Sequence, residues 1–145
     1  MKIKILIPVY NDWQSVSKLI DEINNLSIDQ EFQISIIVVN DASNHDRQDE
    51  ENILENIQSI KILNMKKNQG HARCIATGLK YIHEKEDYDY VIPMDGDGED
   101  RPEEIKQFID NLNINSGSKL PSIWRCNSVF GVFFMKSTVV SKLFI

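Results

Sequence analysis

The sequence predicts an α/β fold, in which a mostly parallel sheet is flanked by helices. Short apolar runs alternate along the chain with segments whose apolar residues recur every three or four positions. Such alternation favours a parallel sheet with right-handed crossovers. Polar residues, many of them Asp, follow the apolar runs directly, and open α/β sheets bind ligands at the carboxyl ends of their strands. The 145 residues are enough for one domain with a hydrophobic core.

The first strand is predicted at Ile3–Val9, an apolar run. A helix follows, and either Asn11 or Asp12 is available as its cap. Its apolar positions recur at helical spacing: Val16, Leu19, Ile20, Ile23 and Leu26. The second strand is predicted at Ile34–Val39, because its nearly continuous β-branched run is typical of a strand buried on both faces.

The middle of the chain predicts a short helix at Asp49–Ile57 and a third strand at Ile60–Leu63. A longer amphipathic helix then contains Gly78, which weakens a helix and therefore indicates close packing at that position. The apolar positions of this helix are Ala72, Ile75, Ala76, Leu79 and Ile82. The fourth strand is predicted at Asp89–Met94.

The last predicted helix begins near Pro102, because proline is favoured in the first helical turn. Its expected core face consists of Ile105, Phe108, Ile109 and Leu112. A polar loop follows this helix, and we therefore expect a ligand-binding domain over residues 1–115 and a partial segment over residues 116–145. Within that segment, Pro121–Arg125 is a candidate short strand.

The C-terminal segment carries a group of apolar residues with basic neighbours. The group consists of Val129, Phe130, Val132, Phe133 and Phe134, with Lys136 and Lys142 nearby. Two interpretations are open: these residues complete the core of the domain, or they form a surface that seeks a membrane or another chain. The apolar end at Leu143–Ile145 predicts a truncated chain or a missing partner surface.

Composition narrows the classes of function. The net charge of −6 argues against a nonspecific nucleic-acid binder. The first apolar run is interrupted by Pro8, so it resembles a strand rather than a signal peptide, and no run reaches the roughly 18 apolar residues that span a bilayer. Cys74 and Cys126 form no disulfide framework. We therefore expect a cytoplasmic protein.

The acidic pair in Asp95-Gly96-Asp97 directly follows the fourth predicted strand. Two carboxylates one residue apart at the edge of a sheet can hold a divalent cation such as Mg²⁺ or Mn²⁺, which commonly bridges to substrate phosphates. The pair therefore predicts a phosphate-bearing substrate. The alternative is an ordinary acidic turn after a strand.

Two further carboxylates, Asp12 and Asp41, follow the first and second predicted strands. Because parallel strands end at the same edge, we expect both to lie with Asp95 and Asp97 in one cluster that requires a cation. Taken singly, Asp12 is also a candidate helix cap and Asp41 a candidate turn residue.

A glycine-containing segment, Asn68–Arg73, lies at the start of the amphipathic helix that precedes the fourth predicted strand. Gly70 allows a close approach of the backbone to a ligand, and Arg73 is suited to pair with phosphate at a helix start. The alternative is a simple loop-to-helix turn with a solvated arginine. We interpret His71 as a polar loop residue, because no second histidine lies at metal-binding spacing.

The order of these motifs resembles the GT-A (Rossmann-like) glycosyltransferases of family 2, over the stretch from about Ile3 to Leu112. The motifs are Ile7-Pro8-Val9-Tyr10-Asn11-Asp12, Val38-Val39-Asn40-Asp41-Ala42-Ser43, Asn68-Gln69-Gly70 with Ala72 and Arg73, and Met94-Asp95-Gly96-Asp97. The stretch Met94–Glu104 is most similar to the polyprenyl-phosphate branch, which includes dolichol-phosphate mannose synthase.

The resemblance implies a nucleotide-diphosphate sugar as donor and transfer of its sugar, as by a hexosyltransferase. It also implies a lipid-phosphate acceptor, a role in polysaccharide or glycolipid assembly of the cell envelope, and a place at the inner face of the membrane. By analogy, Pro8, Tyr10 and Asp12 line the nucleoside pocket, Asp41 binds the base, Gly70 and Arg73 lie near the nucleotide, Asp95 faces the ribose or metal, and Asp97 coordinates Mg²⁺ or Mn²⁺.

The chain departs from the family pattern at several positions. Asp12 replaces a usual Glu, Asn40 and Ala42 replace an Asp and a Gly, and Gly98–Arg101 replaces a Leu-Gln-(His/Asp)-Pro stretch. No general base is identified, and the usual acceptor half does not follow. Two alternatives are an inactive nucleotide-sugar-binding remnant and a haloacid dehalogenase-type phosphatase, whose Asp-x-Asp normally follows the first strand.

Overall fold

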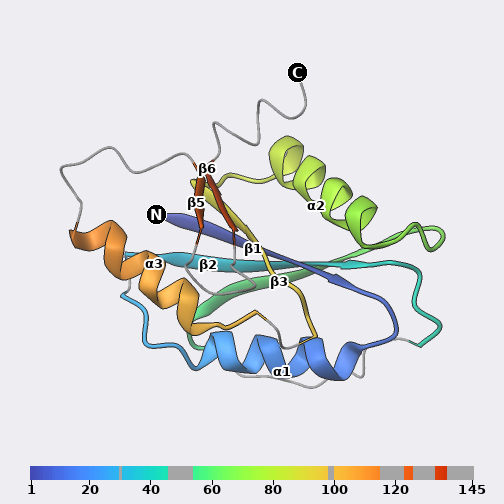
Figure 1. Cartoon of the computed structure of the whole chain (residues 1–145), viewed down its shortest axis with the longest axis horizontal. Coiled ribbons are helices and arrows are strands. Elements are labelled where there is room, and N and C mark those ends of the chain that lie inside the picture. The colour runs from blue at the N-terminus through green and yellow to red at the C-terminus, as the bar shows by residue number, and fades with distance from the viewer. Residues whose placement is uncertain (30, 46–53, 98–99, 115–122, 126–132, 137–145) are drawn as a thin grey trace.

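The computed structural model describes residues 1–29, 31–45, 54–97, 100–114, 123–125 and 133–136. The described strands form one sheet of six in the order β3-β2-β1-β4-β6-β5 (Figure 1). The strands are β1 (Lys2–Val9), β2 (Gln33–Asn40), β3 (Ile57–Asn64), β4 (Tyr90–Pro93), β5 (Ile123–Arg125) and β6 (Phe133–Lys136). The helices are α1 (Trp13–Asn24), α2 (His71–Lys85) and α3 (Glu103–Ile114).

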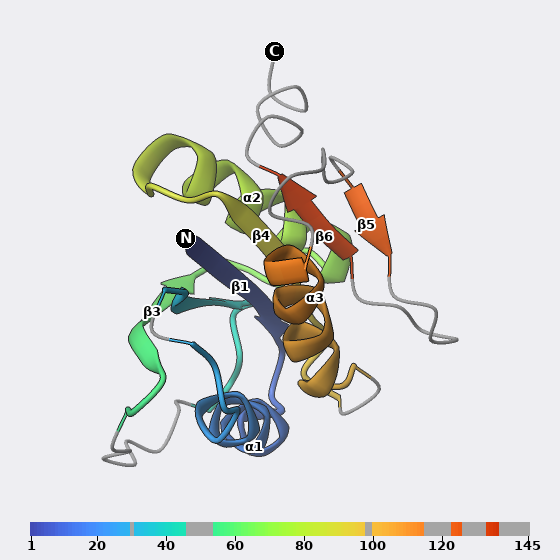
Figure 2. The same ribbon diagram turned by 90° about the vertical axis from the view of Figure 1, so that its left-hand side faces the viewer.

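The sheet is mostly parallel, which confirms the predicted fold class. Strand β1 pairs in parallel with both β2 and β4, and β2 pairs in parallel with β3. Strand β6 is antiparallel to β4 and to β5. Figure 2 shows α2 on one side of the sheet and α1 on the other.

Alternate residues of the central strands supply two cores. The first core includes Ile3, Ile5 and Ile7 of β1 and packs against α1 and α3. The second includes Leu6 of β1 and packs against α2. Because successive side chains of a strand point to opposite faces, one apolar strand can serve both layers. Of the predicted α3 core face, Ile105, Phe108 and Ile109 are buried; the side chain of Leu112 lies outside the described part.

The short helix predicted at Asp49–Ile57 is partly wrong. Residues 46–53 lie outside the described part, but Leu54–Asn56 are not helical and Ile57 begins β3. Ile57 is 4% exposed and is paired with Ile34 of β2. Burial and strand pairing therefore decide its conformation over the local spacing that favoured a helix.

The C-terminal segment contributes to the same sheet as the rest of the chain. Strand β5 lies within the predicted strand Pro121–Arg125, and β6 contains Phe133 and Phe134. Strand β6 pairs with β4 at Tyr90 and Val91. At these positions the tail extends the sheet, whereas Val129, Phe130 and Val132 lie outside the described residues. None of the described helices is long and apolar enough to cross a bilayer.

Gly78 allows α2 to approach the sheet closely, as its place in the predicted helix indicated. A Cβ at this position would lie 2.2 Å from Leu6 Cδ1 and 3.0 Å from Val39 Cγ2. Leu6 and Val39 are fully buried, so they have little room to move. The absence of a side chain therefore sets the distance between α2 and β1.

Gly78→Ala is expected to lower the thermal midpoint by about 3 °C or more. Alanine favours a helix by about 1 kcal/mol over glycine, but overpacking a tight core costs about 1–3 kcal/mol. Scanning calorimetry of this variant should be compared with Thr77→Ala on the exposed side of the same helix. A thermal midpoint that rises in Gly78→Ala would contradict the close contact.

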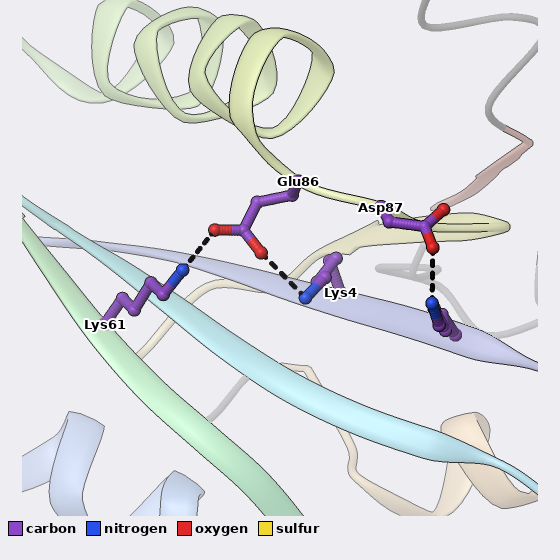
Figure 3. A network of polar contacts seen from close by, with 5 residues as sticks. Lys4, Lys61, Glu86 and Asp87 are labelled. Atoms are coloured by element: carbon purple, nitrogen blue, oxygen red, sulfur yellow. Dashed lines mark hydrogen bonds and ion pairs between the residues drawn. The ribbon is translucent and has the colours of Figure 1, made fainter.

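A carboxylate at the end of α2 joins two strands (Figure 3). Glu86 accepts a hydrogen bond from Lys4 Nζ of β1 at 2.9 Å and another from Lys61 of β3. The side chains of Glu86 and Lys4 are only 9% and 11% exposed. Next to this pair, Asp87 accepts a hydrogen bond from Lys2. The network therefore holds the end of α2 against the sheet.

Candidate functional site

A pocket of about 190 Å³ lies at the carboxyl ends of β1 and β4. It is lined by Pro8, Val9, Tyr10, Asp12, Val16, His71, Asp95, Gly96 and Asp97. These residues come from the loop after β1, the start of α1, the start of α2 and the turn after β4. The edge of the sheet that the sequence predicted to bind a ligand therefore carries a pocket.

The loop after β1 presents Tyr10 and Asp12 to this pocket. Tyr10 is 48% exposed, so its ring is available to a ligand. Asp12 is also the N-cap of α1, because its Oδ1 accepts a hydrogen bond from the Ser15 N–H at 3.3 Å. Asp12 thus both lines the pocket and caps α1, whereas the sequence left ligand binding and helix capping as alternatives.

Asn40 connects the ends of β2 and β3. Its Nδ2 donates to Asn64 Oδ1 at 2.9 Å, and its Oδ1 accepts from the Ser43 N–H at 2.9 Å. A carboxylate has no hydrogen to donate to Asn64. The amide therefore suits this position, where the resemblance placed an Asp in other members of the family.

Asp41 is 3% exposed, and both of its carboxylate oxygens are engaged. Oδ1 accepts from the Gln69 N–H and Oδ2 from the Gly70 N–H, each at 2.8 Å. The carboxylate therefore holds the loop that precedes α2. Burial, with the nearby Asp41 charge, raises the pKa of the Cys74 thiol to about 11, so this thiol stays protonated at neutral pH.

Two residues that the sequence predicted to bind the ligand, Gly70 and Arg73, lie at the start of α2. Gly70 has a φ of 87° and is the N-cap of the helix. Arg73 is exposed, and its Nη1 donates to Gln69 Oε1 at 3.4 Å. The described lining of the pocket does not include Asp41, Gly70 or Arg73.

His71 lines the pocket instead, with Nε2 at 3.4 Å from Asp95 Oδ1. The sequence predicts a polar loop residue at this position, but His71 is the first residue of α2. The available signal was its place directly after Gly70, at the start of a helix that faces the strand ends.

The turn after β4 needs a glycine between its two carboxylates. A Cβ at Gly96 would lie 2.8 Å from Val16 Cγ2, so α1 packs directly on the turn backbone. The Asp95 N–H donates to Asp100 Oδ2 at 2.6 Å. Burial raises the pKa of Asp100 to about 6, and the charges of Asp95, Glu104 and Asp97 add to this effect. Above pH 6, the Asp100 carboxylate is therefore mainly ionised and adds a negative charge next to the Asp95 backbone.

The four predicted carboxylates do not form a preformed metal-binding site in the described part of the chain. Across the described part of the chain, no three His, Cys, Asp or Glu side chains are grouped to hold a metal ion. Asp41 instead accepts hydrogen bonds from the backbone N–H groups of Gln69 and Gly70, which lie 28 and 29 residues further along the chain. Asp95 and Asp97 alone still fit Mg²⁺, because this ion is commonly held by one or two carboxylates together with substrate phosphates.

The fold and this site define a class of protein. A parallel sheet with helices on both faces carries a pocket at its carboxyl edge, and the pocket combines an exposed aromatic ring with acidic side chains. Such pockets in α/β proteins bind nucleotides and other phosphorylated ligands. Comparison with known proteins narrows this class.

Residues 4–142 match the family described as Glycosyl transferase family 2, and the chain belongs to this family. A glycosyltransferase of a Synechocystis species is 29% identical over 113 residues, which are 76% of this chain and 34% of the relative. The dolichol-phosphate mannosyltransferase of Pyrococcus furiosus is 26% identical over 116 residues, or 80% and 31% of the two chains. The chain thus spans less than half the length of these relatives.

Solved structures share the GT-A fold. Residues 1–349 of S. aureus TarS, in complex with UDP-GlcNAc, have a TM-score of 0.68 at 15% identity, and the match covers 100% of this chain and 48% of that TarS chain. The mannosyltransferase PcManGT from Pyrobaculum calidifontis, in complex with GDP-Man and Mn²⁺, has a TM-score of 0.67 at 13% identity, covering 97% and 46%. The GT-A fold and the family predicted from the motifs are both confirmed, and the family match argues against the phosphatase alternative.

Proposed function

We propose that this chain binds a nucleotide-diphosphate sugar in the pocket at the ends of β1 and β4 and transfers the sugar to an acceptor. The observation that carries the proposal is the pocket itself, which combines Tyr10 with Asp95 and Asp97 in a chain of a glycosyltransferase family. The UDP-GlcNAc in the TarS complex and the GDP-Man in the PcManGT complex support the class of donor.

Within this proposal, the nucleoside lies against the loop after β1. Pro8 and Tyr10 offer apolar and aromatic surface, and Asp12 offers a carboxylate acceptor for hydroxyl groups. Asp41 and Gly70 contribute by holding the start of α2, where His71 reaches the pocket. A contact between Arg73 and the nucleotide stays a prediction, as does a direct bond from Asp41 to the base.

The diphosphate is placed near the turn after β4. Asp95 and Asp97 are the proposed ligands of Mg²⁺ or Mn²⁺, and the Mn²⁺ in the PcManGT complex supports the use of a divalent cation. When bound, such a cation supplies neutralisation of the charge that develops on the leaving diphosphate. The carboxylate of Asp100 adds negative charge and accepts from the Asp95 N–H, which supports the same placement.

We further propose a polyprenyl phosphate as acceptor and a place at the inner face of the membrane, for polysaccharide or glycolipid assembly. The similarity to the dolichol-phosphate mannosyltransferase supports this choice. Transfer of radiolabelled sugar to polyprenyl phosphate in liposomes is the direct assay. Labelled lipid is the expected product, and transfer only to water or to a soluble sugar would contradict a lipid acceptor.

An alternative is a chain that binds the nucleotide sugar without transferring it. The observation that favours it is the coverage, because the chain spans 34% and 31% of two relatives. Binding and turnover are therefore measured separately: binding without labelled product supports this alternative, and product supports the transferase.

The binding test is calorimetry with UDP and with GDP, each with and without Mn²⁺. We expect at least one of the two nucleotides to bind more than tenfold tighter with Mn²⁺, which is about 1.4 kcal/mol, because the cation offsets repulsion between diphosphate and carboxylates. If the chain binds neither UDP nor GDP, either with Mn²⁺ or without it, the proposed function is refuted.

A further inference from the structure

Three hydrogen bonds join the loop after β1 and the first residue of α1 to the loop after β2. The Asn11 N–H donates to Ser43 Oγ at 2.9 Å, and the Asn44 N–H donates back to Asn11 Oδ1 at 2.7 Å. The Trp13 Nε1–H donates to the His45 carbonyl oxygen at 2.8 Å. We call these five residues the loop clamp. It connects segments that lie 32 and 33 residues apart in the chain.

The backbone of Asn11 is adapted to this contact. Its φ of 59° lies in the left-handed region, which asparagine adopts more readily than most residues other than glycine. In this conformation Asn11 uses both its backbone N–H and its side-chain oxygen toward the second loop. The second loop is itself anchored, because the Ser43 N–H donates to the buried Asn40.

Asn11 is not required to begin α1. The cap of that helix is Asp12, whose Oδ1 accepts from the Ser15 N–H. The contacts of the Asn11 side chain therefore concern the geometry between the two loops. Asn11 also stands between Tyr10 and Asp12, and both of these neighbours line the pocket.

We propose that Asn11 is a positioning residue for nucleotide binding, which acts with Ser43 through the loop clamp to hold Tyr10 and Asp12 at the pocket before the ligand arrives. A site held in its binding geometry loses less conformational entropy when the ligand binds. This inference rests on the proposed function. It predicts that the clamp determines affinity for the nucleotide and leaves affinity for the cation unchanged, because Asp95 and Asp97 lie on the separate turn after β4.

The test uses the full chain and two independent ways of opening the clamp. Asn11→Gly keeps the left-handed conformation accessible and removes the acceptor for Asn44, and Ser43→Ala removes the acceptor for Asn11. Ser43→Thr retains a hydroxyl and is the conservative variant. Asn25→Gly, at the exposed C-cap of α1, controls for the general effect of an Asn→Gly change.

Calorimetry with whichever of UDP or GDP binds the native chain should show about tenfold weaker binding in Asn11→Gly and in Ser43→Ala. Ser43→Thr and Asn25→Gly should stay within about threefold of the native chain, a difference well under 1.4 kcal/mol. The affinity for Mn²⁺ alone should not change in any variant. The thermal midpoint of Asn11→Gly should match that of Asn25→Gly within a few degrees, which a general structural defect would not produce.

Two outcomes would overturn the inference, and they are distinguishable from failure of the proposed function. Native nucleotide affinity in both Asn11→Gly and Ser43→Ala would remove the positioning function of the clamp. Equal losses of nucleotide and Mn²⁺ affinity would show a general loss of structure instead. If the native chain itself binds neither UDP nor GDP, the proposed function fails first, and the inference with it.

Discussion

Asp97→Ala is expected to abolish the effect of Mn²⁺ on nucleotide binding while the chain stays folded. Asp97 lines the pocket and is exposed, so its removal leaves no buried cavity. With one of two proposed carboxylate ligands lost, affinity in the presence of Mn²⁺ should fall about 100-fold, or about 2.7 kcal/mol. Affinity without Mn²⁺ should stay the same or rise slightly, because a negative charge near the diphosphate is removed.

The matched control for this experiment is Asp110→Ala. Asp110 is an exposed carboxylate on α3 that is paired with Lys106 at 3.4 Å, away from the residues that line the pocket. The Asp110→Ala substitution removes the same formal charge as Asp97→Ala. It should leave nucleotide affinity within about twofold at moderate salt, where charges beyond about 10 Å are screened. Metal dependence that survives in Asp97→Ala would reject Asp97 as a ligand, whatever the native chain binds.

Glu86→Gln is expected to lower the free energy of unfolding by about 3 kcal/mol at neutral pH, because removing one partner of a buried ion pair leaves the other charge uncompensated. Lys4 would keep its place in β1, where its side chain is 11% exposed. The partly exposed Lys61 would turn to solvent at little cost. Urea unfolding at pH 7 measures the effect. The control is Glu84→Gln, an exposed pair with Lys80 at 3.8 Å, which should change stability by less than about 0.5 kcal/mol.

The stabilisation that the Glu86–Lys4 ion pair contributes depends on pH in a definite direction. Burial alone would raise the pKa of Glu86, but hydrogen bonds and attraction from Lys61 and Lys4 outweigh it, so the pKa falls below its ordinary value of 4.5. The contribution to stability is therefore fully present above pH 4.5 and is lost as the pH falls through the lower pKa of the folded state. The difference between native chain and Glu86→Gln should shrink in acid, and a difference that grows below pH 4 would contradict the assignment.

Local sequence signals were sufficient for the order of most elements. The β-branched run of β2 and the helical spacing of α1, α2 and α3 depend on residues close together in the chain. Gly78 was interpreted as a close contact because glycine inside a helix is otherwise unfavourable, and the Leu6 contact confirms it. The motifs after successive strands indicated the family, and the match over residues 4–142 confirms that assignment.

The partners of the polar side chains depended on the tertiary structure. The sequence placed Asp41 in a metal cluster, but its carboxylate meets the backbone of Gln69 and Gly70 across a separation of 28 and 29 residues. His71 gave no metal spacing in the sequence, yet the packing of α2 brings it to the pocket. Strand β6 lies between β4 and β5, a position that follows from pairing and not from its own residues.

The sequence by itself therefore determined the fold class, the family and the edge of the sheet that carries the pocket. These features are encoded in spacings of two to four residues and in the residues that directly follow each strand. The tertiary structure decided which side chains share the pocket and which hold the loops together, as Asn11 and Ser43 do. Each such hydrogen bond joins residues far apart in the chain, so its geometry exists only after the strands have paired.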